Sequence, residues 1–235
     1  MTRYFVWDRT TRWFHWINVV CVIGLIVFGL FLLNNKAFGI SKEGKILLKT
    51  IHAYIGYVFV LNLLVRVIWG FIGGTYSRWK NILPFHKGYA KASKDYLANT
   101  PFYKGHNPIA KLIVAMMFLL MVTQATTGLV LAGTDLYLPP FGHEIAEWVT
   151  GDDERHLKIK GLTPLNKKNV DTKLFKEMRA FRKPYISLHK LIFYILTFAI
   201  FLHILGVVIT EIREKNGIVS AMFSGEKVSD KEPVD

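Results

Sequence analysis

The chain has 235 residues, of which 51% are hydrophobic, and a formal net charge of +13 at pH 7. Soluble proteins rarely have so high an apolar fraction, and no basic helix or aromatic-basic module supports nucleic-acid binding. The single cysteine, Cys21, excludes an intrachain disulfide and a cysteine-ligated iron–sulfur cluster. The composition therefore points to a membrane protein.

Four apolar stretches are long enough to cross a membrane, since a spanning helix needs roughly 20 residues. They cover residues 13–33, 51–72, 109–132 and 185–210. The first is too long for the apolar region of a signal peptide and lacks a small-residue cleavage site, so we expect a retained helix. The pattern predicts an all-α integral membrane protein, a single membrane domain 1–235 built as an up-down-up-down four-helix bundle.

The segments outside the spans differ in character. Residues 34–50 form a short loop, and residues 73–108 form a longer, Gly-rich and basic loop. In the loop 135–183, "GHEIAEWVT" and "VDTKLFKEMRAFRK" each indicate a helix, so this outer loop is expected to be partly helical. The polar tail 216–235 is expected to be partly disordered.

Basic residues outside the spans predict the orientation of the chain. Thirteen lie on one face, in the N-terminus, the second loop and the tail: Arg3, Arg9, Arg12, Arg78, Lys80, Lys87, Lys91, Lys94, Lys104, Arg213, Lys215, Lys227 and Lys231. The short first loop has four: Lys36, Lys42, Lys45 and Lys49. The positive-inside rule therefore places both termini in the cytoplasm.

Four histidines lie inside the spans: His15, His52, His189 and His203. An ionisable residue in a span indicates function, although a lone neutral histidine can simply bond a neighbouring helix. The fourteen residues from His189 to His203 make about 1400° of rotation and about 21 Å of rise. Both rings therefore share one helix face but are too far apart to bind one metal ion.

The predicted orientation pairs these histidines across helices. His52 and His189 fall at the outer end, and His15 and His203 fall toward the cytoplasm. Neither level adds a carboxylate or thiolate, whereas zinc needs four ligands, or three plus water. Two imidazoles on opposite sides of a plane suit a six-coordinate haem iron. We therefore expect two non-covalent b-type haems.

The fourteen-residue interval leads from His15 to Gly29 and from His52 to Arg66. Gly29 would make room for the outer porphyrin or allow close helix packing. Arg66 would bind an inner propionate or a quinone headgroup, or else extend toward the interface. Arg12 lies one turn before His15. It would either contact an inner propionate or contribute to the positive charge that orients the chain in the membrane.

The motif "GHNP" precedes the third span. Asn107 can cap that helix with Pro108 at its first position. A direct redox role for His106 is the less favoured interpretation.

Taken together, these segments resemble one family. "VWDRTTRWFHW" is similar to the opening of the prokaryotic cytochrome b561 family, which includes the b-type cytochrome subunits of membrane nickel–iron hydrogenases. "IHAYIGYVFVLNLLVRVIWGF", "GHNPIAKL", "LHKLIFYILTFAIFLHILGVV" and "AMFSGEK" resemble its later segments, so the likeness runs from residue 6 to residue 227. The resemblance implies a bacterial inner-membrane protein with two b haems, and the four histidines match its ligand positions.

The resemblance also implies electron transfer between the quinone pool and a periplasmic partner, such as a c-type cytochrome or a hydrogenase. An electron-transfer subunit is favoured over a stand-alone enzyme. One alternative is a superoxide:quinone oxidoreductase, whose anionic substrate basic outer residues would attract. These residues are Lys42, Lys45, Lys49, Arg182 and Lys183. A transporter or proton relay is remote, because the histidines form two distant pairs without acidic residues in the spans.

Overall fold

The computed structural model describes residues 2–85, 87–151, 159, 162–166 and 168–235. The chain forms two compact units, each built from several segments. Unit 1 contains Met1–Val19, Leu61–Met121 and Tyr194–Asp235. Unit 2 contains Val20–Val60 and Val122–Phe193.

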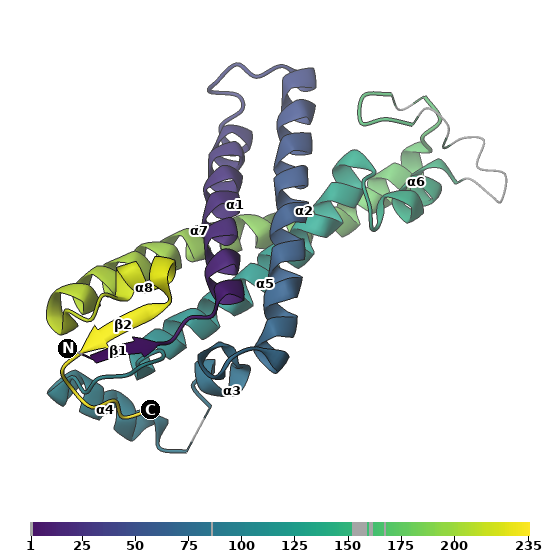
Figure 1. Cartoon of the computed structure of the whole chain (residues 1–235). Helices are drawn as coiled ribbons and strands as arrows, with labels where there is room; N and C mark the ends of the chain where they lie inside the picture. Colours follow the sequence, from purple (N-terminus) through teal and green to yellow (C-terminus); the bar gives the residue numbers. More distant parts are fainter. Residues whose placement is uncertain (1, 86, 152–158, 160–161, 167) are drawn as a thin grey trace. The chain divides into compact units, whose positions relative to one another are not determined.

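The described residues form eight α-helices. Four are long and apolar enough to span a membrane: α1 (Arg9–Leu33), α2 (Lys42–Ile72), α5 (Pro108–Leu136) and α7 (Thr172–Glu214). The shorter elements are β1 (Thr2–Phe5), η1 (Thr75–Ser77), α3 (Trp79–Ile82), α4 (Tyr89–Asn99), α6 (Gly142–Thr150), α8 (Ile218–Ser224) and β2 (Glu226–Ser229). The predicted all-α membrane class is confirmed (Figure 1).

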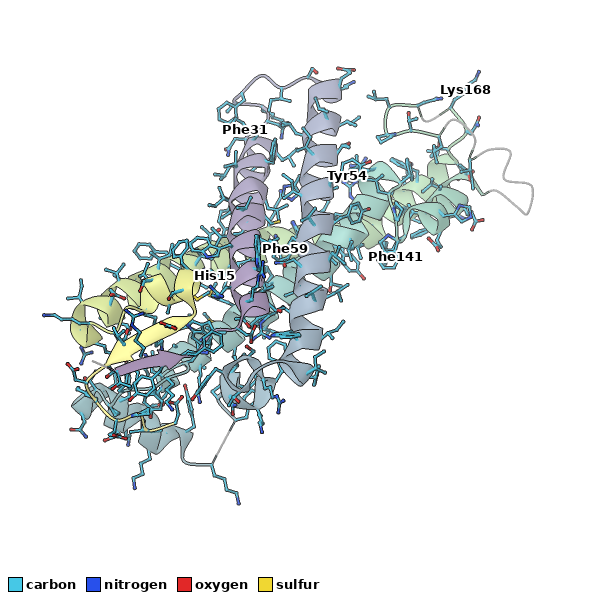
Figure 2. All side chains as sticks on the ribbon, viewed as in Figure 1. His15, Phe31, Tyr54, Phe59, Phe141 and Lys168 are labelled. Carbon is cyan, nitrogen blue, oxygen red and sulfur yellow. The ribbon has the colours of Figure 1, made fainter. Side chains whose placement is uncertain are left out.

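The long helices keep many large apolar side chains exposed. Phe71 is 71% exposed, Val20 70% and Leu119 68%. Phe31 and Tyr54, labelled in Figure 2, are further exposed side chains of α1 and α2. Lipid tails are as apolar as these side chains, so a membrane helix need not hide them from its surroundings. The exposure therefore fits helices that face lipid.

The C-terminal segment is folded within unit 1, so the expectation of a partly disordered tail is wrong. β2 pairs antiparallel with β1, with Arg3 opposite Val228 and Tyr4 opposite Lys227 (Figure 1). Val234 N–H also donates to the Phe102 carbonyl at 3.0 Å. These partners are remote in sequence, and no local pattern in the polar tail predicts them.

Two helix starts follow from capping side chains. Asn107 Oδ1 accepts the Ala110 N–H at 2.8 Å, as predicted for the start of α5. Asp8 Oδ1 accepts the Thr11 N–H at 2.8 Å and caps α1. The same carboxylate accepts bonds from Trp69 Nε1 and the Ser77 hydroxyl, so it also joins the start of α1 to the end of α2 and to η1.

The helices outside the spans differ partly from expectation. α6 coincides with the predicted "GHEIAEWVT" helix. The second predicted loop helix is continuous with the fourth span, so α7 runs for 43 residues with Pro184 inside it. The loop 73–108 also contains η1, α3 and α4, which the sequence analysis treated as irregular.

In unit 2, three long helices meet at one carboxylate. Asp135, near the end of α5, forms ion pairs with Lys49 of α2 and Arg182 of α7. All three side chains are less than one-third exposed. The contact therefore ties α2, α5 and α7 together.

Candidate functional site

The histidine pair of unit 2 consists of His52 on α2 and His189 on α7. Their ring centroids are 6.4 Å apart and the ring planes are inclined at 72°. Two metal–imidazole bonds of about 2 Å each, plus about 1 Å from each nitrogen to its ring centre, would separate the centroids by about 6 Å. The spacing therefore fits one metal ion between the two rings.

A threonine on α5 fixes the protonation of His189. The Thr127 hydroxyl lies 2.8 Å from His189 Nδ1 and 2.9 Å from the Thr123 carbonyl. A hydroxyl has one proton, and donating it to the carbonyl leaves its oxygen to accept a bond from Nδ1–H. The lone pair of His189 is then on Nε2, the atom that would bind iron.

In this structure the Nε2 atom of His189 contacts the side-chain amide of Gln124. Gln124 Nε2 lies 3.1 Å away, while Gln124 Oε1 is buried without a hydrogen-bond partner among the described residues. Among these residues the buried His52 Nδ1 also lacks a partner. A metal ion between the rings would replace the amide at Nε2, with a turn of the Gln124 side chain.

Two glycines leave space beside the same pair. A Cβ atom on Gly29 would lie 3.6 Å from His52 Cε1, and one on Gly128 would lie 3.5 Å from His189 Cε1. Larger side chains at either position would extend over an imidazole ring. The residues of this site therefore fit a flat group held between two histidines, and Gly29 lies at the level predicted for it.

The second pair, His15 on α1 and His203 on α7, belongs to unit 1. The two rings lie within range of mutual electrostatic interaction. His15 packs edge-on against Trp16, with 5.3 Å between ring centroids. Figure 2 labels His15 on α1. The two histidines predicted for the inner level therefore belong to the same unit.

Arg66 of α2 is a buried cation in unit 1, with 3% of its surface exposed. Its guanidinium carbon lies 5.8, 5.1 and 5.4 Å from the ring centroids of Phe14, Trp79 and Phe118. Nη2 donates to the Ser77 carbonyl at 3.0 Å, but the buried Nη1 has no partner among the described residues. A buried unpaired donor on a cation suits an anionic group.

Arg12 is held at the start of α1 by the C-terminal segment. Its Nη1 donates to the Phe223 carbonyl of α8, while its buried Nε has no partner in the described part of the chain. Trp16 Nε1 donates to the neighbouring Met222 carbonyl at 3.0 Å. Arg12 therefore keeps one donor for a further acceptor.

His106 lies before α5 in unit 1 and stacks on Trp7 at 4.7 Å between ring centroids. Burial, reinforced by the charges of Lys227, Arg66 and Lys111, lowers the pKa of His106 to about 3. Its ring is therefore neutral at physiological pH.

Among the described residues, no group of three or more His, Cys, Asp or Glu side chains could hold a metal ion. A zinc site with protein ligands alone needs more donors than either pair provides. The donor chemistry of both pairs is that of a haem iron, whose porphyrin supplies the remaining nitrogens.

The contribution of α5 to the His52–His189 pair was not predicted from the sequence. Gln124, Thr127 and Gly128 follow one another at helical spacing on a span without a histidine. Polar residues three apart, followed by glycine, on an otherwise apolar face are the signal that could have indicated this face.

Comparison with known proteins places the chain in a family. The family model described as prokaryotic cytochrome b561 matches residues 6–225. No solved structure matches significantly.

Curated relatives agree with this match. The "Probable Ni/Fe-hydrogenase 1 B-type cytochrome subunit" of Escherichia coli (strain K12) is 32% identical over 141 residues, which cover 54% of this chain and 60% of the relative. The "Probable Ni/Fe-hydrogenase B-type cytochrome subunit" of Bradyrhizobium diazoefficiens is 25% identical over 95% of this chain and 85% of its own length. The chain therefore belongs to the prokaryotic cytochrome b561 family and is a multi-pass membrane cytochrome of the haem-b class.

Proposed function

We propose that the chain carries electrons across the bacterial inner membrane between the quinone pool and a periplasmic redox protein. Its axial ligands would be His52 and His189 for an outer haem, and His15 and His203 for an inner haem. The 6.4 Å separation of the His52 and His189 ring centroids is the observation that carries this proposal. When bound, each haem supplies an iron that accepts and releases one electron.

Unit 1 supports the inner site through its unpaired cationic donors. Arg66 Nη1 and Arg12 Nε are both buried without a hydrogen-bond partner among the described residues. Haem b has two propionates, and charge-assisted bonds to such carboxylates are stronger than neutral ones. Arg66 and Arg12 would hold an inner propionate, or a quinone oxygen in the case of Arg66.

Helix α7 would connect the two redox centres, because it carries one histidine of each pair. His189 and His203 both lie on this uninterrupted helix, and fourteen residues correspond to about 21 Å of rise. Ligation by two histidines fills both axial positions of an iron, so neither centre would keep a position for oxygen. This chemistry favours electron carriage over oxygenation.

The names of the relatives suggest the redox partner of this chain. Both relatives described above are named as B-type cytochrome subunits of Ni/Fe-hydrogenases. A hydrogenase is therefore the first candidate, and a c-type cytochrome is the second. The chain would be an electron-transfer subunit of such an assembly.

The superoxide alternative has less support. Of its five basic outer residues, Lys49 and Arg182 share the single negative charge of Asp135, which compensates half of their combined charge. Lys45 is 3.4 Å from Asn35 Oδ1. The remaining charge is a weaker attractant for a small anion than the sequence count suggests.

Membrane orientation is supported by the contacts of unit 1. β1, the 73–107 region and the C-terminal segment are joined there by hydrogen bonds, so these three basic segments lie on one side of the spans. The positive-inside rule would make this side cytoplasmic. The outer site would then face the periplasm.

Single replacements of the outer ligands test the assignment. Changing His52→Ala or His189→Ala removes one of two axial imidazoles, so each purified variant should hold one b haem per chain. The haem content measured against protein concentration reports this loss.

His143→Ala is the matched control. His143 lies on α6 in unit 2, where it contacts Glu147 rather than the histidine pair. This variant should keep both haems. A His52→Ala or His189→Ala protein that retains two haems would overturn the ligand assignment.

A further inference from the structure

A small cavity lies in unit 1 beside the C-terminal segment. Its volume is about 30 Å³, and its lining includes Trp7, His106, Glu214 and Lys227. One water needs roughly 10–15 Å³ on this measure, so the cavity has room for about two waters. A quinone ring or a porphyrin is too large for it.

The C-terminal segment forms one wall of this cavity. β2 places Lys227 opposite Tyr4 of β1. The Asp235 carboxylate accepts bonds from the N–H groups of Lys104 at 2.6 Å and Gly105 at 3.0 Å. The wall is therefore anchored on both sides of Lys227.

Lys227 is a buried cation with 2% of its surface exposed. Its ammonium donates to the carbonyls of Gly105 at 2.9 Å and Tyr103 at 3.3 Å, and lies 5.7 Å from the Trp7 ring centroid. No carboxylate of the described residues lies within ion-pair distance of it. Two carbonyls use two of the three ammonium protons, which leaves one for the cavity.

Glu214, on α7, provides a proton route to the surface. Its carboxylate accepts bonds from Tyr96 Oη at 2.6 Å and from Asn216 Nδ2 at 2.7 Å. The side chain lines the cavity and its residue is partly exposed. A fixed, partly solvated carboxylate between water and a cavity can relay protons.

Two further lining atoms lack hydrogen bonds. Trp7 Nε1 and His106 Nδ1 are buried without a partner among the described residues. A water in the cavity can accept from the indole N–H and donate to a neutral His106 Nδ1, which satisfies both. Thr210 of α7 also lines the cavity, and His203 lies seven residues earlier on the same helix, about 10 Å away along its axis.

We propose that this cavity is a proton-exchange site linked to the inner haem, with Lys227 as the group that binds the proton. Glu214 connects Lys227 to cytoplasmic water, and water held by Trp7 and His106 extends the network toward His203. This inference rests on the proposed function, because it needs an inner haem.

The charges of the step balance. One electron would be added at the inner site by a quinol, which would release its own proton to water. One proton moves from water through Glu214 to the neutral Lys227 amine, whose lone pair forms the new N–H bond. The buried region gains no net charge, which matters because uncompensated buried charge is unfavourable.

The surroundings of Lys227 allow this exchange above about pH 8, where its amine can be neutral. Burial lowers the pKa of Lys227 to about 8, while the carboxylates of Glu214 on α7 and Asp235 at the C-terminus act in the opposite direction. The other ionisable groups around the network are His106, Arg66 and Lys111, from the loop before α5, from α2 and from α5. An added electron favours the ammonium and so raises its pKa further.

The test is the pH dependence of the inner-haem midpoint potential in a His52→Ala chain, which lacks the outer haem. The potential should be constant below about pH 8, where Lys227 is protonated in both redox states. Above that pH it should fall toward about 59 mV per pH unit, the tenfold-per-unit limit for one electron and one proton. Lys227→Met should abolish the fall and lower the potential at pH 6.

Lys231→Met is the matched control. Lys231 lies in the same C-terminal segment as Lys227 and also donates to a backbone carbonyl, that of Thr100, but it is exposed. It should behave as the parent chain does. Glu214→Gln removes a carboxylate that favours the ammonium, so the fall should begin at lower pH.

The outcomes separate this inference from the proposed function. A parent chain without an inner haem would overturn both. A haem-loaded parent whose potential is constant from pH 6 to pH 10 would overturn the proton site alone, whether or not Lys227→Met folds. An unchanged fall in Lys227→Met would do the same.

Discussion

At the scale of single residues, the informative signal was ionisable side chains, which are rare inside a membrane. His15, His52, His189 and His203 could be singled out because lipid penalises ionisable groups. Thr127 and Gln124 are common in helices, and only the contact of α5 with His189 reveals their part. The sequence could thus indicate the candidate ligands but not the side chains that would orient them.

Thr127→Val should weaken the outer haem site, because valine keeps the shape of threonine but cannot accept the His189 Nδ1–H bond. Loss of such a supporting bond commonly lowers metal-site affinity by about 10–100-fold. Titration of haem-free protein with haem, followed by absorbance, measures the affinity of the outer site. The inner site should be unaffected.

The neighbouring Thr126→Val is the control for that measurement. Thr126 is exposed and its hydroxyl bonds the Val122 carbonyl of its own helix. Equal affinities in the two variants would show that Thr127 does not support His189.

At the scale of elements, the spans were predictable because a continuous run of about twenty apolar residues indicates a membrane-spanning helix. Hydropathy did not give their ends: α7 begins at Thr172 rather than near Tyr185, within the helix predicted separately over 170–183, and passes through Pro184. The polar segment before the span is helical in its own right, so hydropathy alone places the boundary too late. β2 was missed because its partner, β1, lies at the other end of the chain.

Asp135→Asn should destabilise the packing of α2, α5 and α7. It leaves Lys49 and Arg182 without a carboxylate in a partly buried setting, which should lower the free energy of unfolding by about 1–3 kcal/mol. Thermal unfolding in detergent, followed by circular dichroism, measures the change.

Glu147→Gln makes the same chemical change on the exposed face of α6, where it contacts His143. It should change stability by less than about 0.5 kcal/mol. If Asp135→Asn were equally mild, the ion pairs would not hold the three helices.

At the scale of the whole molecule, each compact unit contains one histidine pair. Unit 1 has His15 and His203, and unit 2 has His52 and His189. α7 supplies a ligand to both. With a haem bound at each pair, this division would give a one-electron centre on each half of the chain, as a transmembrane carrier requires.

The orientation of the chain can be tested with single cysteines in a Cys21→Ala background. Lys36→Cys in the first loop should react with a membrane-impermeant maleimide added to intact spheroplasts. Lys231→Cys in the C-terminal segment should react only after lysis, because the positive-inside rule predicts that the more basic side faces the cytoplasm. Both positions are exposed. The reverse pattern would place the outer haem in the cytoplasm.

The most direct test of the central claim is the haem content and absorption spectrum of the purified wild-type chain. Two b haems per chain are expected, with reduced spectra that carbon monoxide does not change, because two histidine ligands would occupy both axial positions of each iron. A folded but colourless protein, a single haem per chain, or a carbon monoxide adduct would contradict the account.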